Sequence, residues 1–134
     1  MELFALEAVE SWHLAVNARD YDLLCALTSR DVELVGPRGS TRGHDELRAW
    51  LGRAAFTAEP LRWFCGARGD VVVEQRGRWA GADAPGATTD ERIVASAFRV
   101  VEGRVVRYQR FDALHDALAT CELSDDDEVL QRSW

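Results

Sequence analysis

Gln75, Trp79, Tyr108 and Arg110 are the residues whose types and spacing could form a binding site. Tyr108 and Arg110 stand two positions apart in an alternating run, and Gln75 and Trp79 share one parity in an earlier run. Such spacing places each pair on one face of a β-strand. Aromatic walls with a few convergent polar groups are typical of small-molecule sites, and a half-buried Arg favours an anionic group such as a carboxylate. We therefore predict a pocket for a small hydrophobic or carboxylated molecule.

The cysteines and histidines form no metal or redox motif. They are scattered along the chain and make no CxxC pair, and no His stands at the sequence spacing from a Cys that zinc sites use. We expect reduced, buried thiols, no metal site and no cofactor. The residues concerned are Cys25, Cys65, Cys121, His13, His44 and His115.

Composition narrows the classes of partner. The chain has 134 residues, which fits one domain, and 47% of them are hydrophobic. Its formal net charge is -7, and its 16 basic residues are all Arg and form no cluster. Because phosphate neutralisation supplies most nucleic-acid affinity, we expect no nucleic-acid partner. The acidic start lacks the basic region of a signal peptide, and no apolar run matches a bilayer, so we expect a soluble, cytoplasmic protein without a membrane partner.

Helical signals fill the first half of the chain. Residues 4–18 carry an apolar stripe at spacings of three and four, which lies on one helix face. Asp20 is placed to cap a short second helix that reaches Leu27 and buries Leu23, Leu24 and Leu27. A third helix opens at residues 43–46, where acidic residues suit the helix dipole. The apolar faces of the first and third helices comprise Ala5, Val9, Trp12, Val16, Leu47, Trp50 and Leu51.

One strand is predicted early in the chain, and strand signals dominate after residue 60. We predict strands at 31–35, 61–68, 71–80, 93–101 and 104–111, a loop at 81–90, a two-residue hairpin turn at Glu102 and Gly103, and a closing helix capped by Asp112. The order gives an α+β domain whose helices pack on one face of a curved antiparallel sheet. A strongly bent sheet leaves a cone-shaped space, which is a pocket only where small or polar side chains leave it unfilled.

We expect a single domain at residues 1–123 and an acidic C-terminal tail at residues 124–134. Ser124 and the acidic residues after it are typical of a helix start or of a solvated tail. Trp134 would be unusual in water, so the tail is expected to dock on the body or on a partner.

Three stretches together resemble the nuclear transport factor 2-like superfamily and, within it, the SnoaL-like proteins. Residues 12–27 read WHLAVNARDYDLLCAL, residues 31–51 read DVELVGPRGSTRGHDELRAWL, and residues 98–118 read FRVVEGRVVRYQRFDALHDAL. The resemblance implies a cone-shaped, cystatin-like fold and a homodimer. It leaves the activity unassigned, because this superfamily contains isomerases, cyclases, hydrolases and binding proteins.

The resemblance to ketosteroid isomerases of this fold does not extend to their catalytic residues. Those enzymes need a general base and two donors for the developing enolate. The position of the base resembles Gly36, which cannot take a proton. The two donor positions resemble Trp12 and Ser96. All three roles are therefore altered.

The resemblance to limonene-epoxide hydrolases is similarly incomplete. Their Asp-Arg-Asp set activates a water, and its Arg and first Asp correspond to Gln75 and Gly77 in this sequence. The final-strand Asp corresponds to Arg110, which also takes the position of the acid/base in SnoaL-type cyclases. The resemblance therefore predicts a pocket without an obvious general base.

Three readings of this pocket remain open. The first is a SnoaL-like protein that binds a small molecule. The second is an isomerase, cyclase or hydrolase, in which His44 or Asp112 serves as base. The third is a structural dimerisation domain, favoured if Trp12 and Trp50 are core residues that touch the sheet. The candidate pocket-lining residues are Trp12, Trp50, Gln75, Trp79, Tyr108 and Arg110.

Overall fold

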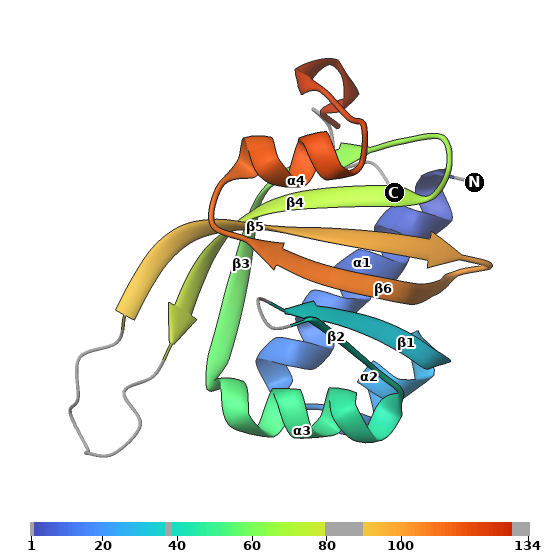
Figure 1. Ribbon diagram of the computed structural model, residues 1–134, viewed down its shortest axis with the longest axis vertical. Coiled ribbons are helices and arrows are strands. Elements are labelled where there is room, and N and C mark those ends of the chain that lie inside the picture. Colours follow the sequence, from blue (N-terminus) through green and yellow to red (C-terminus); the bar gives the residue numbers. More distant parts are fainter. Residues whose placement is uncertain (1, 37–38, 80–89, 130–134) are drawn as a thin grey trace.

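Six strands form one open, curved sheet in the computed structural model, which describes residues 2–36, 39–79 and 90–129 (Figure 1). The strand order is β2-β1-β6-β5-β4-β3, and every neighbouring pair is antiparallel except β1 and β6. The sheet is therefore mixed, whereas the sequence predicts an antiparallel one. The rest of the sheet separates β1 from β6 in the chain, so no tight turn forces them to run in opposite directions. The strands are β1 (Thr28–Gly36), β2 (Gly39–Arg42), β3 (Phe56–Cys65), β4 (Asp70–Trp79), β5 (Asp90–Val101) and β6 (Arg104–Phe111).

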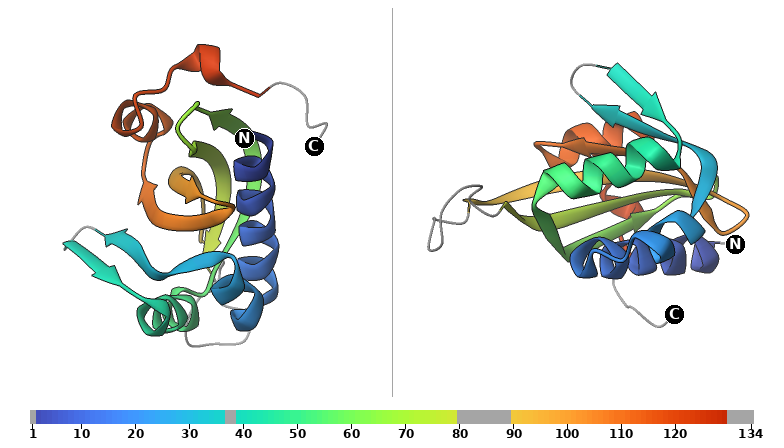
Figure 2. Two further views of the ribbon diagram at one scale, coloured as in Figure 1. Left: turned by 90° about the vertical axis from the view of Figure 1, so that its right-hand side faces the viewer. Right: turned by 90° about the horizontal axis from the view of Figure 1, so that it is seen from below.

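Helices cover both faces of this sheet (Figure 2). Helix α1 packs on the inner, concave face against Val71 and Val73, and α4 packs on the opposite face against Val72. Alternate residues of β4 therefore serve two separate apolar cores. The prediction of helices on one face holds for α1, α2 and α3 but not for α4. The helices are α1 (Glu2–Ala18), α2 (Tyr21–Ala26), α3 (His44–Ala54), α4 (Leu114–Thr120) and the 3₁₀ turn η1 (Asp125–Asp127).

Helix α2 begins as predicted, with the Asp20 carboxylate accepting a hydrogen bond from the Leu23 amide at 3.0 Å. Leu24 is buried, but Leu23 is 38% exposed and Leu27 is half-buried. The prediction that all three leucines are buried is therefore wrong. Consecutive helical residues point about 100° apart, so this short helix does not bury both Leu23 and Leu24.

Several strand boundaries differ from those predicted. Strand β3 begins at Phe56 and includes Pro60, which lies where the pairing with β4 is irregular. A proline is tolerated at such a position on an edge strand. Strand β2 has no apolar alternation and is fully exposed, which explains why no strand was predicted there. The predicted loop at 81–90 lies, apart from Asp90, outside the described residues.

Helix α4 starts after Ala113, and the Asp112 side chain makes no capping hydrogen bond. The prediction that Asp112 caps it is therefore wrong. The hairpin turn at Glu102 and Gly103 is confirmed, and both residues have the positive φ angles, 53° and 79°, that such a two-residue turn requires.

The described part of the C-terminal tail lies along edge strand β3. Ser124 caps η1 through a capping box, which favours the first of the two alternatives, a helix start, although the helix is a single 3₁₀ turn. Glu128 then pairs with Phe64, and the Val129 amide donates to the Trp63 carbonyl at 2.8 Å. The Arg62 guanidinium holds the Glu128 carboxylate with two 2.9 Å hydrogen bonds. Trp134, predicted to dock on the body or a partner, lies outside the described residues.

Helices long and apolar enough to cross a membrane do not occur in the described part of the chain.

Candidate functional site

A line of hydrogen-bonded polar side chains crosses the interior between α1 and the sheet. The His13 Nδ1 atom lies 2.8 Å from the Val9 carbonyl, and its Nε2 atom lies 2.8 Å from the Gln75 Nε2 atom. Ser96 donates to the Gln75 carbonyl oxygen at 2.9 Å. Tyr108 is hydrogen-bonded to Ser96. All four side chains are buried, so the line joins α1, β4, β5 and β6 without contact with bulk water.

The direction of each bond in this polar line follows from His13. A backbone carbonyl only accepts, so Nδ1 carries the proton and Nε2 accepts a hydrogen from the Gln75 amide. The Gln75 oxygen then faces Ser96 and accepts a hydrogen bond from its hydroxyl group. Ser96 is in turn hydrogen-bonded to Tyr108. Each member has a partner, which is what buried polar groups require.

Burial controls the titration of both ends of the polar line. Desolvation lowers the pKa of His13 to about 4, although the bond to the Val9 carbonyl raises it. Burial raises the pKa of Tyr108, opposed by its hydrogen bond with Ser96 and by the charge of Arg110. At neutral pH both side chains are uncharged. Because the Gln75 amide occupies His13 Nε2, this histidine is not available as a base for a ligand.

Aromatic rings surround the polar line. The Trp12 ring centroid lies 4.9 Å from that of Tyr108 and 5.4 Å from that of Phe98. Trp50 reaches across from α3, with its centroid 6.0 Å from Trp12 and 5.4 Å from Tyr108. The structure thus brings four predicted site residues together, since Gln75 lies beside this cluster. Both tryptophans touch the sheet through Tyr108, which favours the structural reading for this central region.

The other two predicted site residues lie at one end of the interior, the Trp79 end, formed by Phe56, Gly77, Trp79 and Arg110. The Trp79 ring packs on Phe56 at 5.0 Å between centroids. The Arg110 guanidinium lies 5.1 Å above Trp79 and 5.7 Å above Phe56, and it is exposed to solvent. The Arg110 guanidinium therefore covers two rings from the solvent side and is not a half-buried group in a pocket wall. Among the described residues, no carboxylate forms an ion pair with it.

Two aromatic rings fill the space above Gly77. A Cβ atom at Gly77 would lie 2.8 Å from Trp79 Cη2 and 2.9 Å from Phe56 Cε1, closer than carbon atoms can approach. The two rings therefore occupy the volume that a larger side chain at this position would need. A carboxylate here, as in the epoxide hydrolases that the sequence resembles, is incompatible with this packing.

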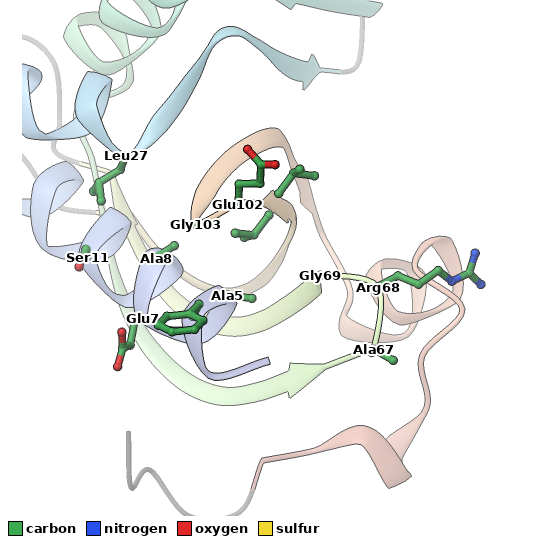
Figure 3. A pocket seen from close by; sticks show the side chains of 13 residues that line it. Ala5, Glu7, Ala8, Ser11, Leu27, Ala67, Arg68, Gly69, Glu102 and Gly103 are labelled. Atoms are coloured by element: carbon green, nitrogen blue, oxygen red, sulfur yellow. The ribbon is translucent and has the colours of Figure 1, made fainter. Parts of the chain in front are cut away.

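A pocket of about 690 Å³ opens at the opposite, hairpin end of the interior (Figure 3). Small side chains of α1, Ala5 and Ala8, face the β5–β6 hairpin across it. Gly69 in the β3–β4 turn packs directly on the Val100 carbonyl, which ties the two hairpins together. The lining of this hairpin-end pocket consists of Phe4, Ala5, Glu7, Ala8, Ser11, Leu27, Ala67, Arg68, Gly69, Val100, Val101, Glu102 and Gly103.

Sequence reasoning missed the hairpin-end pocket. The available signal was the pair Ala5 and Ala8 at a spacing of three, opposite turns that contain Gly69 and Gly103. Alanine is also the best helix former, so the pair alone does not indicate a gap. Sequence reasoning also missed that His13 and Ser96 complete the buried polar line.

The other candidates for chemistry lie apart from this pocket. His44 is half-buried at the start of α3, where its Nε2 atom lies 3.1 Å from the Thr28 hydroxyl. Asp112 is exposed after β6. The three cysteines are free, with Cys65 buried and Cys25 and Cys121 half-buried. Groups of three or more metal-ligating side chains do not occur among the residues that the structure describes.

The model of the SnoaL-like domain matches residues 9–108 of the 134-residue chain. The chain belongs to the SnoaL-like domain family. A search of curated proteins gave no match to this SnoaL-like chain.

Solved structures share its nuclear transport factor 2-like fold. Bal32a from a soil-derived mobile gene cassette is 21% identical, with 91% of this chain and 97% of that chain covered and a TM-score of 0.71. A putative polyketide cyclase from Xanthomonas campestris pv. campestris is also 21% identical, with 88% and 96% covered and a TM-score of 0.71. An M. tuberculosis LEH-like epoxide hydrolase is 25% identical, with 87% of each chain covered and a TM-score of 0.64. These likenesses establish the fold of the SnoaL-like chain and no particular activity.

Proposed function

We propose that this SnoaL-like protein binds a small hydrophobic molecule in the hairpin-end pocket. The observation that carries the proposal is an apolar space of about 690 Å³ at one end of an interior whose centre is packed. Small-molecule sites typically measure about 300 to 1,000 Å³ and are lined mostly by apolar groups. The volume and lining of this pocket fit that class.

Exposed hydrophobic side chains at the pocket rim support the proposal. Phe4 is 60% exposed and Val101 is 49% exposed, and both line the pocket. Large apolar side chains that gather around a hollow are typical of binding sites. A ligand seated between α1 and the β5–β6 hairpin would cover both of them.

The test is a fluorescence titration with Nile red, an uncharged apolar dye. We expect the wild-type protein to bind the dye and Ala8→Phe to weaken binding at least about ten-fold, because a phenyl ring would occupy the pocket. Ala18→Phe is the matched control, since Ala18 is exposed on the same helix and does not line the pocket. Far-ultraviolet circular dichroism checks that both variants are folded. Equal binding by wild type and Ala8→Phe would contradict the proposal.

The structural domain is the second candidate, and the packed contacts of Trp12 and Trp50 with Tyr108 favour it. This candidate predicts that the purified protein binds no apolar probe and forms the homodimer implied by the family resemblance. Native mass spectrometry measures both properties together. A dimer without bound probe would support the structural candidate, and a dimer that carries the probe would support ligand binding.

The carboxylated ligand predicted from Arg110 belongs to the Trp79 end rather than to the hairpin-end pocket. There the exposed guanidinium lies over two aromatic rings. That ligand remains a prediction for the Trp79 end. The hairpin-end pocket is lined by two acidic side chains, Glu7 and Glu102, and one basic side chain, Arg68.

A further inference from the structure

The rim of the hairpin-end pocket is acidic. Glu7 on α1 and Glu102 in the β5–β6 turn both line the pocket and are exposed. Within the described residues, neither carboxylate takes part in an ion pair. Their carboxylates point outward on opposite sides of the hollow, away from Ala5 and Ala8 (Figure 3). The outer rim of the pocket therefore carries two negative charges, whereas its floor is formed by small apolar side chains.

The pocket lining contains one basic side chain, and its charge is already paired. The Arg68 guanidinium lies 3.0 Å from the Glu122 carboxylate. Its side chain extends away from Ala5 and Ala8 toward the C-terminal region (Figure 3). Arg68 is therefore poorly placed to neutralise Glu7 and Glu102 or to receive an anionic ligand.

The ring of Phe4 adds a second feature that favours a cation. It is 60% exposed at the same rim, so a face of the ring is open to a bound molecule. A cation near the face of an aromatic ring is attracted by its quadrupole. The pocket thus combines apolar walls with a rim that attracts positive charge by two mechanisms.

We infer that the hairpin-end pocket selects hydrophobic cations, meaning small apolar molecules that carry an ammonium group. The apolar body lies between Ala5, Ala8 and Val100, and the ammonium group lies at the outer rim, in the negative potential of the exposed Glu7 and Glu102 carboxylates. This inference rests on the proposed function and names the chemical class of its ligand. A carboxylated ligand would meet repulsion at the same rim.

The size of the preference follows from the exposure of the two carboxylates. Charge pairs in contact with water are weak and are screened by salt. We therefore expect an ammonium ligand to bind about three- to ten-fold more tightly than an uncharged analogue of the same shape, and the preference to shrink as salt is added.

The experiment compares three naphthalene probes that differ in charge: 2-naphthylmethylamine, 2-naphthalenemethanol and 2-naphthylacetate. Their dissociation constants are measured at pH 7 by titration calorimetry with the full chain. We expect the amine to bind most tightly and the acetate most weakly. In Glu7→Gln/Glu102→Gln the amine and the alcohol should bind equally.

The net charge of the protein, -7, would attract any cation and must be separated from the rim. The control is Asp22→Asn/Glu46→Gln, which removes the same charge from exposed positions outside the pocket. This variant should keep the preference for the amine, and its loss there would overturn the inference. If the alcohol binds as tightly as the amine and Ala8→Phe blocks both, the pocket stands and the ligand class is wrong. If none of the probes binds, the proposed function itself fails.

Discussion

The two ends of the interior are built on the same helix and the same sheet, yet side chains fill the space to different extents at the two ends. At the Trp79 end, the rings of Phe56 and Trp79 meet above Gly77 and leave no room for a side chain there. At the hairpin end, Ala5 and Ala8 face turns that contain glycine, and about 690 Å³ stays open. The difference shows that side-chain volume, rather than the curvature of the sheet, decides where a pocket lies in this fold.

The centre separates the two ends. Trp12, Tyr108 and Phe98 pack together there, and the polar line from His13 to Ser96 crosses beneath them. Because protein interiors are close-packed, a centre of this kind holds the two ends at fixed positions. We therefore expect a substitution at one end to leave binding at the other end unchanged.

The largest expected effect comes from cutting the polar line at its middle. In Gln75→Leu, His13 Nε2 loses its donor and the Ser96 hydroxyl loses its acceptor, while both remain buried. An unsatisfied buried polar group costs about 1 to 3 kcal/mol, so the free energy of unfolding should fall by about 2 to 5 kcal/mol. Urea denaturation measures the change. Gln109→Leu is the control, because Gln109 is only half-buried and should lose less than about 1 kcal/mol.

A smaller effect is expected from pH, through His13. Its pKa is about 4 in the folded protein, below the ordinary 6.5, so the unfolded chain takes up a proton first as the pH falls. The contribution of His13 is therefore complete above about pH 6.5 and is lost as the pH falls toward 4. Between pH 7 and pH 5 it should lower the free energy of unfolding by about 2 kcal/mol.

The measurement is urea denaturation at both pH values for the wild type and two variants. His13→Gln should be less stable than wild type at pH 7 but should lack this part of the pH dependence. His115→Gln should keep it, because His115 is exposed on α4. A wild-type slope in His13→Gln would mean that other groups cause the acid sensitivity.

The comparison of the two ends predicts opposite tolerance to added volume. Gly77→Ala adds one methyl group beneath Trp79 and Phe56, where overpacking should cost about 1 to 2 kcal/mol after the gain from restricting the unfolded chain. Ala8→Phe adds a whole ring at the hairpin end and should change stability by less than about 1 kcal/mol, because the ring has space to enter. Thermal unfolding of the two variants checks both values. A larger loss of stability in Ala8→Phe than in Gly77→Ala would mean that the hairpin end is filled and that the Trp79 end has free space.

The sequence predicted the helices, the strands and the face of the sheet on which each strand residue lies. It predicted less well which spaces the side chains leave open. Alternation correctly placed Gln75 and Trp79 on the inner face of β4, and Glu74 on the outer face, where it lies 3.9 Å from Arg62. Parity states which side of the sheet a residue faces. It does not state whether the opposing side chains touch, which depends on helix placement and on the choice of rotamers.

The same limit explains why the sequence did not show which end of the interior is filled and which is open. Nothing in the spacing of Gly77 and Trp79 shows that the indole folds back over the glycine, and nothing in residues 4–18 shows that the alanines face turns rather than side chains. Arg110 lies where parity put it, but it is exposed, and its guanidinium lies over the rings of Trp79 and Phe56 rather than in a pocket wall. Long-range packing of this kind is decided by the whole fold.

The smallest expected effect is the most direct test of the separation between the two ends. Arg110→Ala removes an exposed guanidinium that rests on Trp79, and exposed cation–aromatic contacts contribute about 0.5 to 1 kcal/mol, so stability should fall by no more than that. Arg104→Ala, also on β6 and exposed, is the matched control. Nile red should bind both variants as it binds the wild type, because the hairpin-end pocket does not include either residue. If Arg110→Ala alone abolished binding, the dye would sit at the Trp79 end, and the two rings there would have to part to admit it.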